Sequence, residues 1–190
     1  MSTNLEIELK SDISQEDYER LISQFGSSKI YLQTNYYIDD KDLSVRYLKC
    51  GLRVRQKDDN FELTLKITQE VGRLEINQQI SNKIFKKLVD RNVFPKGEVR
   101  DCLENKLGLD IAKLHVLGEL KTYRLDVPYK TGLICIDKST YNGVTDYEVE
   151  CEDNSEEEAE KHLHEFLEEN NIEYKRSWGT KLKKFLETLN

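Results

Sequence analysis

The sequence has few of the residues that build extracellular, membrane or fibrous proteins. Its 190 residues include 4 Cys, 2 Pro and 1 Trp, and no two cysteines form a Cys-x-x-Cys pair. No apolar run approaches the roughly 20 residues that span a bilayer, and the first residues lack the basic and apolar regions of a signal peptide. We therefore expect a cytoplasmic protein without a membrane partner. Its four cysteines are expected to be reduced, with Cys135 and Cys151 packed on strands.

Common nucleotide-binding and hydrolase motifs are also missing. The sequence has no Gly-x-x-x-x-Gly-Lys-Ser/Thr, no Gly-x-Gly-x-x-Gly and no Gly-x-Ser-x-Gly. Zinc is not indicated either, because His162 and His164 are two residues apart and do not share a helix face. The net charge of −7 disfavours a nucleic-acid partner, whose phosphate backbone would be repelled.

Hydrophobic periodicity predicts the secondary structure. Alternation with period two, typical of strands, occurs in eight segments, residues 5–10, 33–38, 51–56, 61–68, 73–80, 118–127, 133–138 and 145–152. Helical periodicity occurs in five segments, residues 14–25, 81–92, 98–109, 155–171 and 180–189. Strands and helices do not alternate regularly, so the pattern predicts a single α+β domain over residues 1–190 with an antiparallel sheet and flanking amphipathic helices.

The polar faces of these strands carry like charges in pairs. Glu6 and Glu8 share a face, Arg53 and Arg55 share another, and Glu148 and Glu150 a third. Two like charges at that spacing repel by roughly 2.5 kcal/mol at an effective dielectric of about 20. For any single strand, a solvated charged face explains the pattern. The set together is harder to explain in this way, and if the sheet curls into a closed barrel, these faces converge.

Converging faces of this kind suit a metal-bridged polyphosphate. Paired carboxylates are hard oxygen ligands, which Mg²⁺ and Mn²⁺ prefer. Arginine and lysine side chains on neighbouring strands pair well with phosphate oxygens. The arrangement indicates a cation site beside a basic wall.

The order of the motifs resembles that of the CYTH superfamily, also called triphosphate tunnel metalloenzymes. Glu6-Ile7-Glu8-Leu9-Lys10 matches its ExExK signature. Matching motifs follow in the family's order along essentially the whole chain: residues 35–39, 51–55, 63–66, Glu75, residues 120–124, 136–137, 147–150 and 179–181. The resemblance is strongest to bacterial stand-alone CYTH proteins that are often labelled adenylate cyclases.

The resemblance implies a closed, eight-stranded antiparallel β-tunnel that binds a triphosphate together with Mg²⁺ or Mn²⁺. The metal ligands it implies are Glu6, Glu8, Glu75, Asp137, Glu148 and Glu150. The phosphate-binding residues it implies are Lys10, Arg53, Arg55, Lys66, Arg124 and Lys181. The implied catalytic residues are Glu6, Glu8 and Lys10. Lys10 has two possible roles, as a base with a lowered pKa or as a fixed partner of phosphate or carboxylate, and we favour the second.

The shared motifs do not select one activity. Hydrolysis of tripolyphosphate or of an organic triphosphate is the leading hypothesis. The presence of both Glu148 and Glu150 favours catalysis over binding without turnover. The alternatives are thiamine triphosphatase, a class IV-type adenylate cyclase, and a polyphosphate or nucleotide sensor without turnover. Trp178 could lie at a tunnel mouth, but a packing role for it is more common. Outward apolar strand faces leave room for a homodimer.

Overall fold

The computed structural model describes residues 2–26 and 30–189, with the side chains of residues 2–6 left out. The chain divides into two compact units, each made of two separate segments. The first comprises Met1–Glu6 and Gln33–Leu120, and the second comprises Ile7–Leu32 and Lys121–Asn190. The single domain predicted over residues 1–190 stays a prediction. None of the helices in the described ranges is long and apolar enough to span a membrane.

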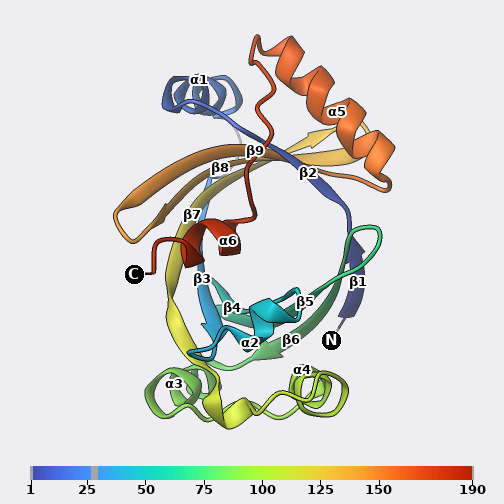
Figure 1. Ribbon diagram of the computed structural model, residues 1–190. Coiled ribbons are helices and arrows are strands. Elements are labelled where there is room, and N and C mark those ends of the chain that lie inside the picture. Colours follow the sequence, from blue (N-terminus) through green and yellow to red (C-terminus); the bar gives the residue numbers. More distant parts are fainter. Residues whose placement is uncertain (1, 27–29, 190) are drawn as a thin grey trace. The chain divides into compact units, whose positions relative to one another are not determined.

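The first unit is built on antiparallel strands in the order β1-β6-β5-β4-β3. The strands are β1 (Ser2–Glu6), β3 (Tyr31–Asp39), β4 (Cys50–Lys57), β5 (Asn60–Thr68) and β6 (Arg73–Ile80). The helical elements are α2 (Ser44–Tyr47), α3 (Asn82–Arg91), α4 (Glu98–Asp101), the π-helical turn η1 (Cys102–Lys106) and the 3₁₀ turn η2 (Ile111–Lys113). In Figure 1, α3 and α4 lie on one side of these strands. Their buried side chains Leu88 and Val99 belong to the same core as Leu52, Val54 and Leu63.

The second unit has the antiparallel order β7-β8-β9-β2. Its elements are β2 (Glu8–Asp12), α1 (Gln15–Phe25), β7 (His115–Tyr129), β8 (Gly132–Tyr141), β9 (Val144–Glu152), α5 (Glu156–Glu169) and α6 (Lys181–Leu186). Strands β3 and β7 each run from one unit into the other. Helices α1 and α5 lie on one side of β8, β9 and β2, and α6 lies on the other side (Figure 1). The core under α1 and α5 includes Leu21, Ile136 and Phe166.

The helices begin where the sequence provides a hydroxyl cap. Ser14 accepts a hydrogen bond from the backbone N–H of Asp17 at 3.0 Å, and Ser155 accepts one from Glu158 at 3.2 Å. Ser81 and Thr180 cap α3 and α6 in the same way. Each cap satisfies a backbone donor that the first helical turn leaves without a partner.

Two tight hairpin turns join neighbouring strands. Strands β4 and β5 are joined through Asp58 and Asp59, and β7 and β8 through Lys130 and Thr131. Asp58 has φ 52° and Lys130 has φ 51°, so both residues adopt the left-handed conformation that tight two-residue hairpins require. The turns fix the strand register, and the register decides which side chains share a face.

The predicted closed eight-stranded barrel needs two corrections. The structure has nine strands, because the segment 5–10 divides at Ile7 into β1, which pairs with β6, and β2, which pairs with β9. Within each unit the strand order is open, ending at β1 and β3 in the first unit and at β7 and β2 in the second. The α+β class, the antiparallel sheet and the flanking helices are confirmed.

Other predictions differ in detail. The helix predicted over residues 98–109 is the single turn α4 followed by the π-helical turn η1, and α2 and η2 were not predicted because such short turns carry no periodicity. All four cysteines are free and buried, with Cys135 on β8 and Cys151 on β9 as predicted.

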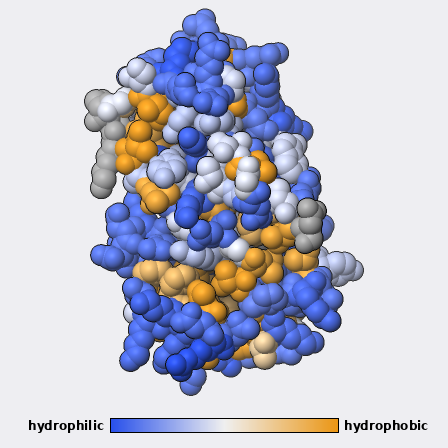
Figure 2. All heavy atoms as spheres, turned by 90° about the vertical axis from the view of Figure 1, so that its left-hand side faces the viewer, coloured by the Kyte–Doolittle hydropathy of each residue, from blue (hydrophilic) through white to orange (hydrophobic). Residues whose placement is uncertain are grey.

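Figure 2 shows hydrophobic residues at several places on the face it presents, among hydrophilic ones. The exposed large side chains include Leu32, Val93 and Tyr123.

Candidate functional site

In the second unit, the strand register gathers polar side chains on one sheet face. Arg124 pairs across the ladder with Asp137, which pairs with Glu148. One step along, Glu150 pairs with Lys10. Residues two apart on a strand share a face, so all five side chains project from the same side. The opposite side carries the apolar residues that α1 and α5 cover.

Three of these side chains form a compact group that we call the acidic triad: Asp137, Glu148 and Glu150. Each contributes one carboxylate oxygen to a set in which all oxygens lie within 4.8 Å of one another. The three side chains are 0%, 1% and 4% exposed. Buried carboxylates this close repel strongly unless cations lie between them.

Lys181 on α6 is one of those cations, and it contacts the whole triad. Its Nζ lies 2.7 Å from Asp137 Oδ2 and 2.7 Å from Glu150 Oε1, and it also contacts Glu148 Oε1. The ammonium group therefore sits among the same oxygens that would hold a metal ion.

Arg124 and Lys10 complete the neutralisation from the strands. The Arg124 guanidinium donates to Asp137 through Nε at 2.8 Å and Nη2 at 2.6 Å, and Nη2 also donates to Glu150 Oε2 at 2.5 Å. Lys10 Nζ lies 2.7 Å from Glu150 and 3.2 Å from Glu8. The fork geometry of arginine fixes the orientation of Asp137, while the lysines act as compact charges.

The pKa shifts follow from these contacts. Burial opposes the charge of Glu150, but Lys10, Lys181 and Arg124 outweigh it and hold the pKa of Glu150 well below its ordinary value. Burial also opposes the charge of Lys10, yet Glu150 and Glu8 raise the pKa of Lys10 above its ordinary value. Lys181 behaves in the same way, since the triad raises its pKa despite burial. All of these groups are charged at neutral pH.

Ion pairs extend the cluster beyond the triad. Among the described residues they connect the carboxylates of Glu8, Asp12, Asp137, Asp146, Glu148, Glu150 and Glu152 with the cations of Lys10, Arg124, Lys181 and Lys184. The triad is therefore part of a larger charged cluster.

A second close group, Cys135 with Glu150 and Glu152, borders the triad. Burial raises the pKa of the Cys135 thiol well above its ordinary value. A protonated thiol is a poor metal ligand, and a soft sulfur does not suit a hard cation. The triad is therefore the better cation site of the two.

The first unit carries a different polar face, which we call the basic face: Arg53, Arg55 and Lys66. Arg53 pairs across the ladder with Thr64, which pairs with Asn77, while Lys66 pairs with Glu75. Lys66 Nζ lies 2.6 Å from Glu75 Oε1. Burial opposes the charge of Glu75, but Lys66 and Arg53 outweigh it and lower the pKa of Glu75.

Two buried donors on this face have no hydrogen-bond partner among the residues that the structure describes. They are Nδ2 of Asn35, whose Oδ1 accepts from Arg55 Nε at 3.2 Å, and Nε of Arg53. Asn35 itself is fully buried. An unmade hydrogen bond at a buried donor costs about 1–3 kcal/mol. Two such donors beside extra positive charge suit an acceptor-rich anion.

The comparison with known families agrees with this geometry. Residues 4–185 match the model of the CYTH domain. The chain belongs to the CYTH family.

Relatives in this family cover most of the chain. The Bacillus subtilis (strain 168) protein named "Putative triphosphatase YjbK" is 34% identical over 154 residues, covering 80% of this chain and 79% of that protein. A crystal structure from Bacillus halodurans, described as a "putative adenylate cyclase", is 35% identical and has a TM-score of 0.90 over 97% of this chain and 99% of that one. The Hippeastrum protein HpAC1 is 22% identical, with a TM-score of 0.84 and 96% of each chain covered. Its name credits HpAC1 with a dominant triphosphatase activity.

Most of the residues predicted from the CYTH signature fall into these two groups. The second unit brings together Glu8, Lys10, Arg124, Asp137, Glu148, Glu150 and Lys181. The first unit brings together Arg53, Arg55, Lys66 and Glu75 on one face. Glu6 ends β1 opposite Arg73, but its side chain lies outside the described part of the structure. Within the first unit, Glu75 lies against Lys66.

Two residues of these polar faces were not predicted as site residues, Lys184 and Asn35. Lys184 is 2% exposed, and its Nζ lies 2.8 Å from Asp12 and 3.4 Å from Glu148. Its position three residues after Lys181 on a helix could have revealed it, because such residues share a face. For Asn35 the sequence carries no such signal, since the missing partner of its buried Nδ2 exists only in the folded chain.

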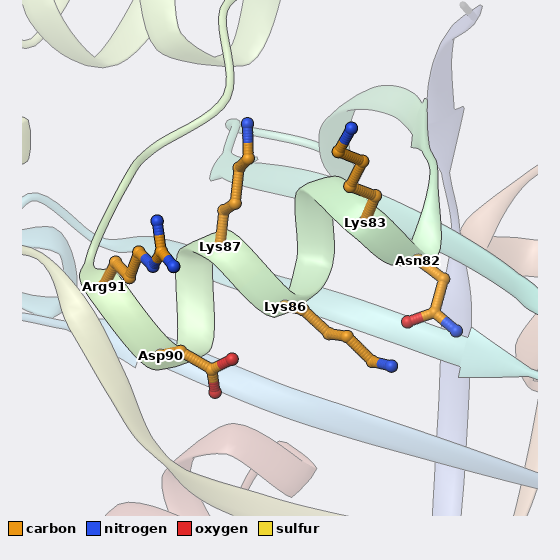
Figure 3. A pocket seen from close by; sticks show the side chains of 6 residues that line it. All are labelled: Asn82, Lys83, Lys86, Lys87, Asp90 and Arg91. Atoms are coloured by element: carbon orange, nitrogen blue, oxygen red, sulfur yellow. The ribbon is translucent and has the colours of Figure 1, made fainter.

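A further basic surface lies on α3 and is a different kind of feature. Its groove is lined by Asn82, Lys83, Lys86, Lys87, Asp90 and Arg91. Figure 3 shows Lys83 and Lys87 pointing to one side of the helix and Lys86 to the other, so the ammonium groups do not converge. The pattern is that of a solvated helix face.

Trp178 is half-exposed, at 51%, and the ammonium groups of Lys183 and Lys184 lie 5.3 Å and 5.9 Å from its ring. The half-exposed ring agrees with the favoured prediction, a partly buried packing anchor for the last helix, because Lys183 and Lys184 both belong to α6.

Proposed function

We propose that this CYTH protein is a divalent-metal-dependent triphosphatase that hydrolyses inorganic tripolyphosphate or an organic triphosphate. The observation that carries the proposal is the acidic triad, with its buried oxygens within 4.8 Å of one another. The basic face supplies the complementary chemistry for phosphate.

The donor set of the triad fits Mg²⁺ or Mn²⁺. All its ligand atoms are carboxylate oxygens, which hard cations prefer. Asp137, Glu148 and Glu150 would hold the ion, with Glu8 as a further ligand, while the metal-binding role of Glu6 stays a prediction from the sequence. When bound, a divalent cation neutralises phosphate oxygens and lowers the pKa of a coordinated water. Glu75 is instead proposed to set the position of Lys66.

The cationic residues are proposed to bind the phosphate chain. Arg53, Arg55 and Lys66 lie on adjacent strands, and the partnerless donors of Arg53 and Asn35 would bind phosphate oxygens. In the second unit, Lys10, Arg124 and Lys181 surround the triad. Fixed cations that already stand in place stabilise the negative charge of the transition state without reorganisation.

Lys10 is proposed to act as a fixed positive charge. The two carboxylates beside it raise its pKa, so it carries a proton at neutral pH and is a poor base. Glu8, which is 10% exposed and next to Lys10, is the better placed of the two to orient a water molecule.

The alternatives differ in what else they need. A cyclase needs a largely apolar pocket for adenine, whereas the α3 groove is lined by charged and amide side chains. A thiamine triphosphatase needs an aromatic surface, and the half-exposed ring of Trp178 offers one. A sensor would bind without turnover.

The test is a product assay with three substrates. Tripolyphosphate, thiamine triphosphate and ATP are each incubated with the protein and Mg²⁺ or Mn²⁺, and free phosphate and cyclic AMP are measured. We expect phosphate release that requires the metal. Cyclic AMP from ATP without orthophosphate would overturn the proposal in favour of a cyclase. Tight binding without any product would indicate a sensor.

The homodimer and the absence of a nucleic-acid partner stay predictions. Gel filtration with light scattering would test the homodimer.

A further inference from the structure

The contact between α6 and the acidic triad has a consequence for metal binding. Lys181 Nζ touches all three carboxylates of the triad, at 2.7 Å for both Asp137 and Glu150. An ammonium group and a divalent cation both need these oxygens, and the buried oxygens lie within 4.8 Å of one another. A divalent cation held by all three carboxylates would take the place of the Lys181 ammonium group, because both contact the same three side chains and like charges at such short range repel strongly.

We propose that Lys181 is the resident cation of the triad and that a divalent metal binds by displacing it. The inference rests on the proposed metal site. Displacement leaves Lys181 charged and free to bind phosphate, so metal loading prepares the residue for the substrate. Lys181 can thus contact either the triad or the phosphate, but not both at once.

The rest of α6 is held by separate contacts. Lys184 is bound to Asp12 at 2.8 Å, and Phe185 is fully buried beside Tyr141, with ring centroids 6.5 Å apart. The helix has six residues, so its first turn depends on tertiary contacts rather than on intrinsic helicity. Loss of the Lys181 contacts is therefore expected to loosen the first turn while Lys184 and Phe185 keep the second turn attached.

The chain carries its own probe for this movement. Trp178 is the only tryptophan and lies three residues before Lys181. Its ring is half-exposed and close to the ammonium groups of Lys183 and Lys184. A change at the start of α6 should therefore alter its fluorescence.

The first experiment measures Mn²⁺ affinity by calorimetry, without substrate, for the native protein, Lys181→Met and Lys184→Met. We expect Lys181→Met to bind Mn²⁺ about tenfold more tightly or better, because the metal no longer competes with a resident cation. Lys184→Met is the matched control: it removes the same charge from the same helix, but among the described residues Lys184 pairs with only one carboxylate of the triad, Glu148 at 3.4 Å, besides Asp12 and Asp146. Its effect should be clearly smaller.

The second experiment needs no variant. Hydrogen exchange of residues 181–186 and Trp178 fluorescence are followed in the native protein as Mn²⁺ is added. We expect the hydrogen-exchange protection of the first turn of α6 to fall and the Trp178 fluorescence to change. Both changes should occur at the Mn²⁺ concentrations at which calorimetry detects binding.

Three results would overturn the inference. Equal gains in affinity for the two variants would mean that only overall charge matters. Unchanged or increased protection of α6 on metal binding would mean that Lys181 stays in place. Failure of all three proteins to bind Mn²⁺ would remove the metal site of the proposed function as well, whereas the first two results leave that site intact.

Discussion

The two compact units differ in how the charges on their polar sheet faces are paired. The second unit buries an acidic cluster and neutralises it from within, through lysines and an arginine that contact several carboxylates at once. The first unit carries an excess of positive charge on its polar face and leaves two buried donors without partners. The acidic cluster of the second unit suits cations that enter it. The basic face of the first unit suits an anion that completes the hydrogen bonds.

The two units differ in this way although their sequence patterns are similar. Both units use alternating strands with like charges two residues apart, and both cover the apolar side with helices. What differs is the extra element on the polar side of the second unit, where α6 delivers Lys181 and Lys184. A charged sheet face thus becomes a buried site when another segment supplies the opposite charge.

The largest expected effect comes from breaking the acidic cluster. Glu150→Gln removes the carboxylate that binds Lys10, Arg124 and Lys181. Loss of a residue that only supports a metal ligand typically costs about 10- to 100-fold in activity. Since Glu150 is proposed as a ligand itself, we expect metal-dependent hydrolysis to fall at least about 100-fold. Phosphate release measures the effect, and far-UV circular dichroism checks the fold. Glu104→Gln, which alters an ion pair with Arg100 outside the cluster, is the control; equal losses in both variants would contradict the assignment.

The next effect comes from breaking the basic face. Arg53→Ala removes a charged donor, so we expect KM for the triphosphate to rise about tenfold or more, which corresponds to about 1.5 kcal/mol or above. The value of kcat should change less. Arg100→Ala is the matched control, because Arg100 pairs with Glu104 on α4 and η1. An unchanged KM in Arg53→Ala would remove this residue from the proposed site.

A smaller effect is expected from exchanging Lys10 for another cation. Lys10→Arg keeps the charge that contacts Glu150 and Glu8, so activity should stay within about tenfold and the pH profile should keep its shape. A loss above about 100-fold, with a shifted profile, would indicate a proton-transfer role instead. Lys10→Met, which removes the charge, should lose more activity than Lys10→Arg.

The smallest effect is expected away from both polar faces. Asp153 accepts a hydrogen bond from His162 Nδ1 at 2.7 Å and joins β9 to α5. Burial opposes its charge, but His162, Asn154 and Thr131 outweigh it and lower the pKa of Asp153. A lowered pKa stabilises the fold above the ordinary carboxyl range, and this stabilisation disappears as the pH falls through the folded-state pKa.

Asp153→Asn should therefore cost about 1–3 kcal/mol of unfolding free energy at pH 7 and much less near pH 3. Urea unfolding at the two pH values measures it. Phosphate release should be unchanged, and a constant cost at both pH values would contradict the assigned origin of the shift.

The sequence by itself determined the local structure and the composition of each face. Period-two alternation located the strands, hydroxyl residues such as Ser14 and Ser155 marked helix starts, and the spacing of Glu148 and Glu150 placed both side chains on one side of β9. These features depend on residues close together in the chain, so their physics is visible in the sequence.

Only the tertiary structure decided which charges meet. Lys10 and Glu150 are 140 residues apart, and Lys181 reaches the triad from a helix that packs on the sheet. The division of the first strand at Ile7, the burial of Lys184 and the partnerless donors of Asn35 and Arg53 arise from the same long-range packing. Strand register and helix docking set these contacts, and both are properties of segments brought together by folding rather than of any one segment.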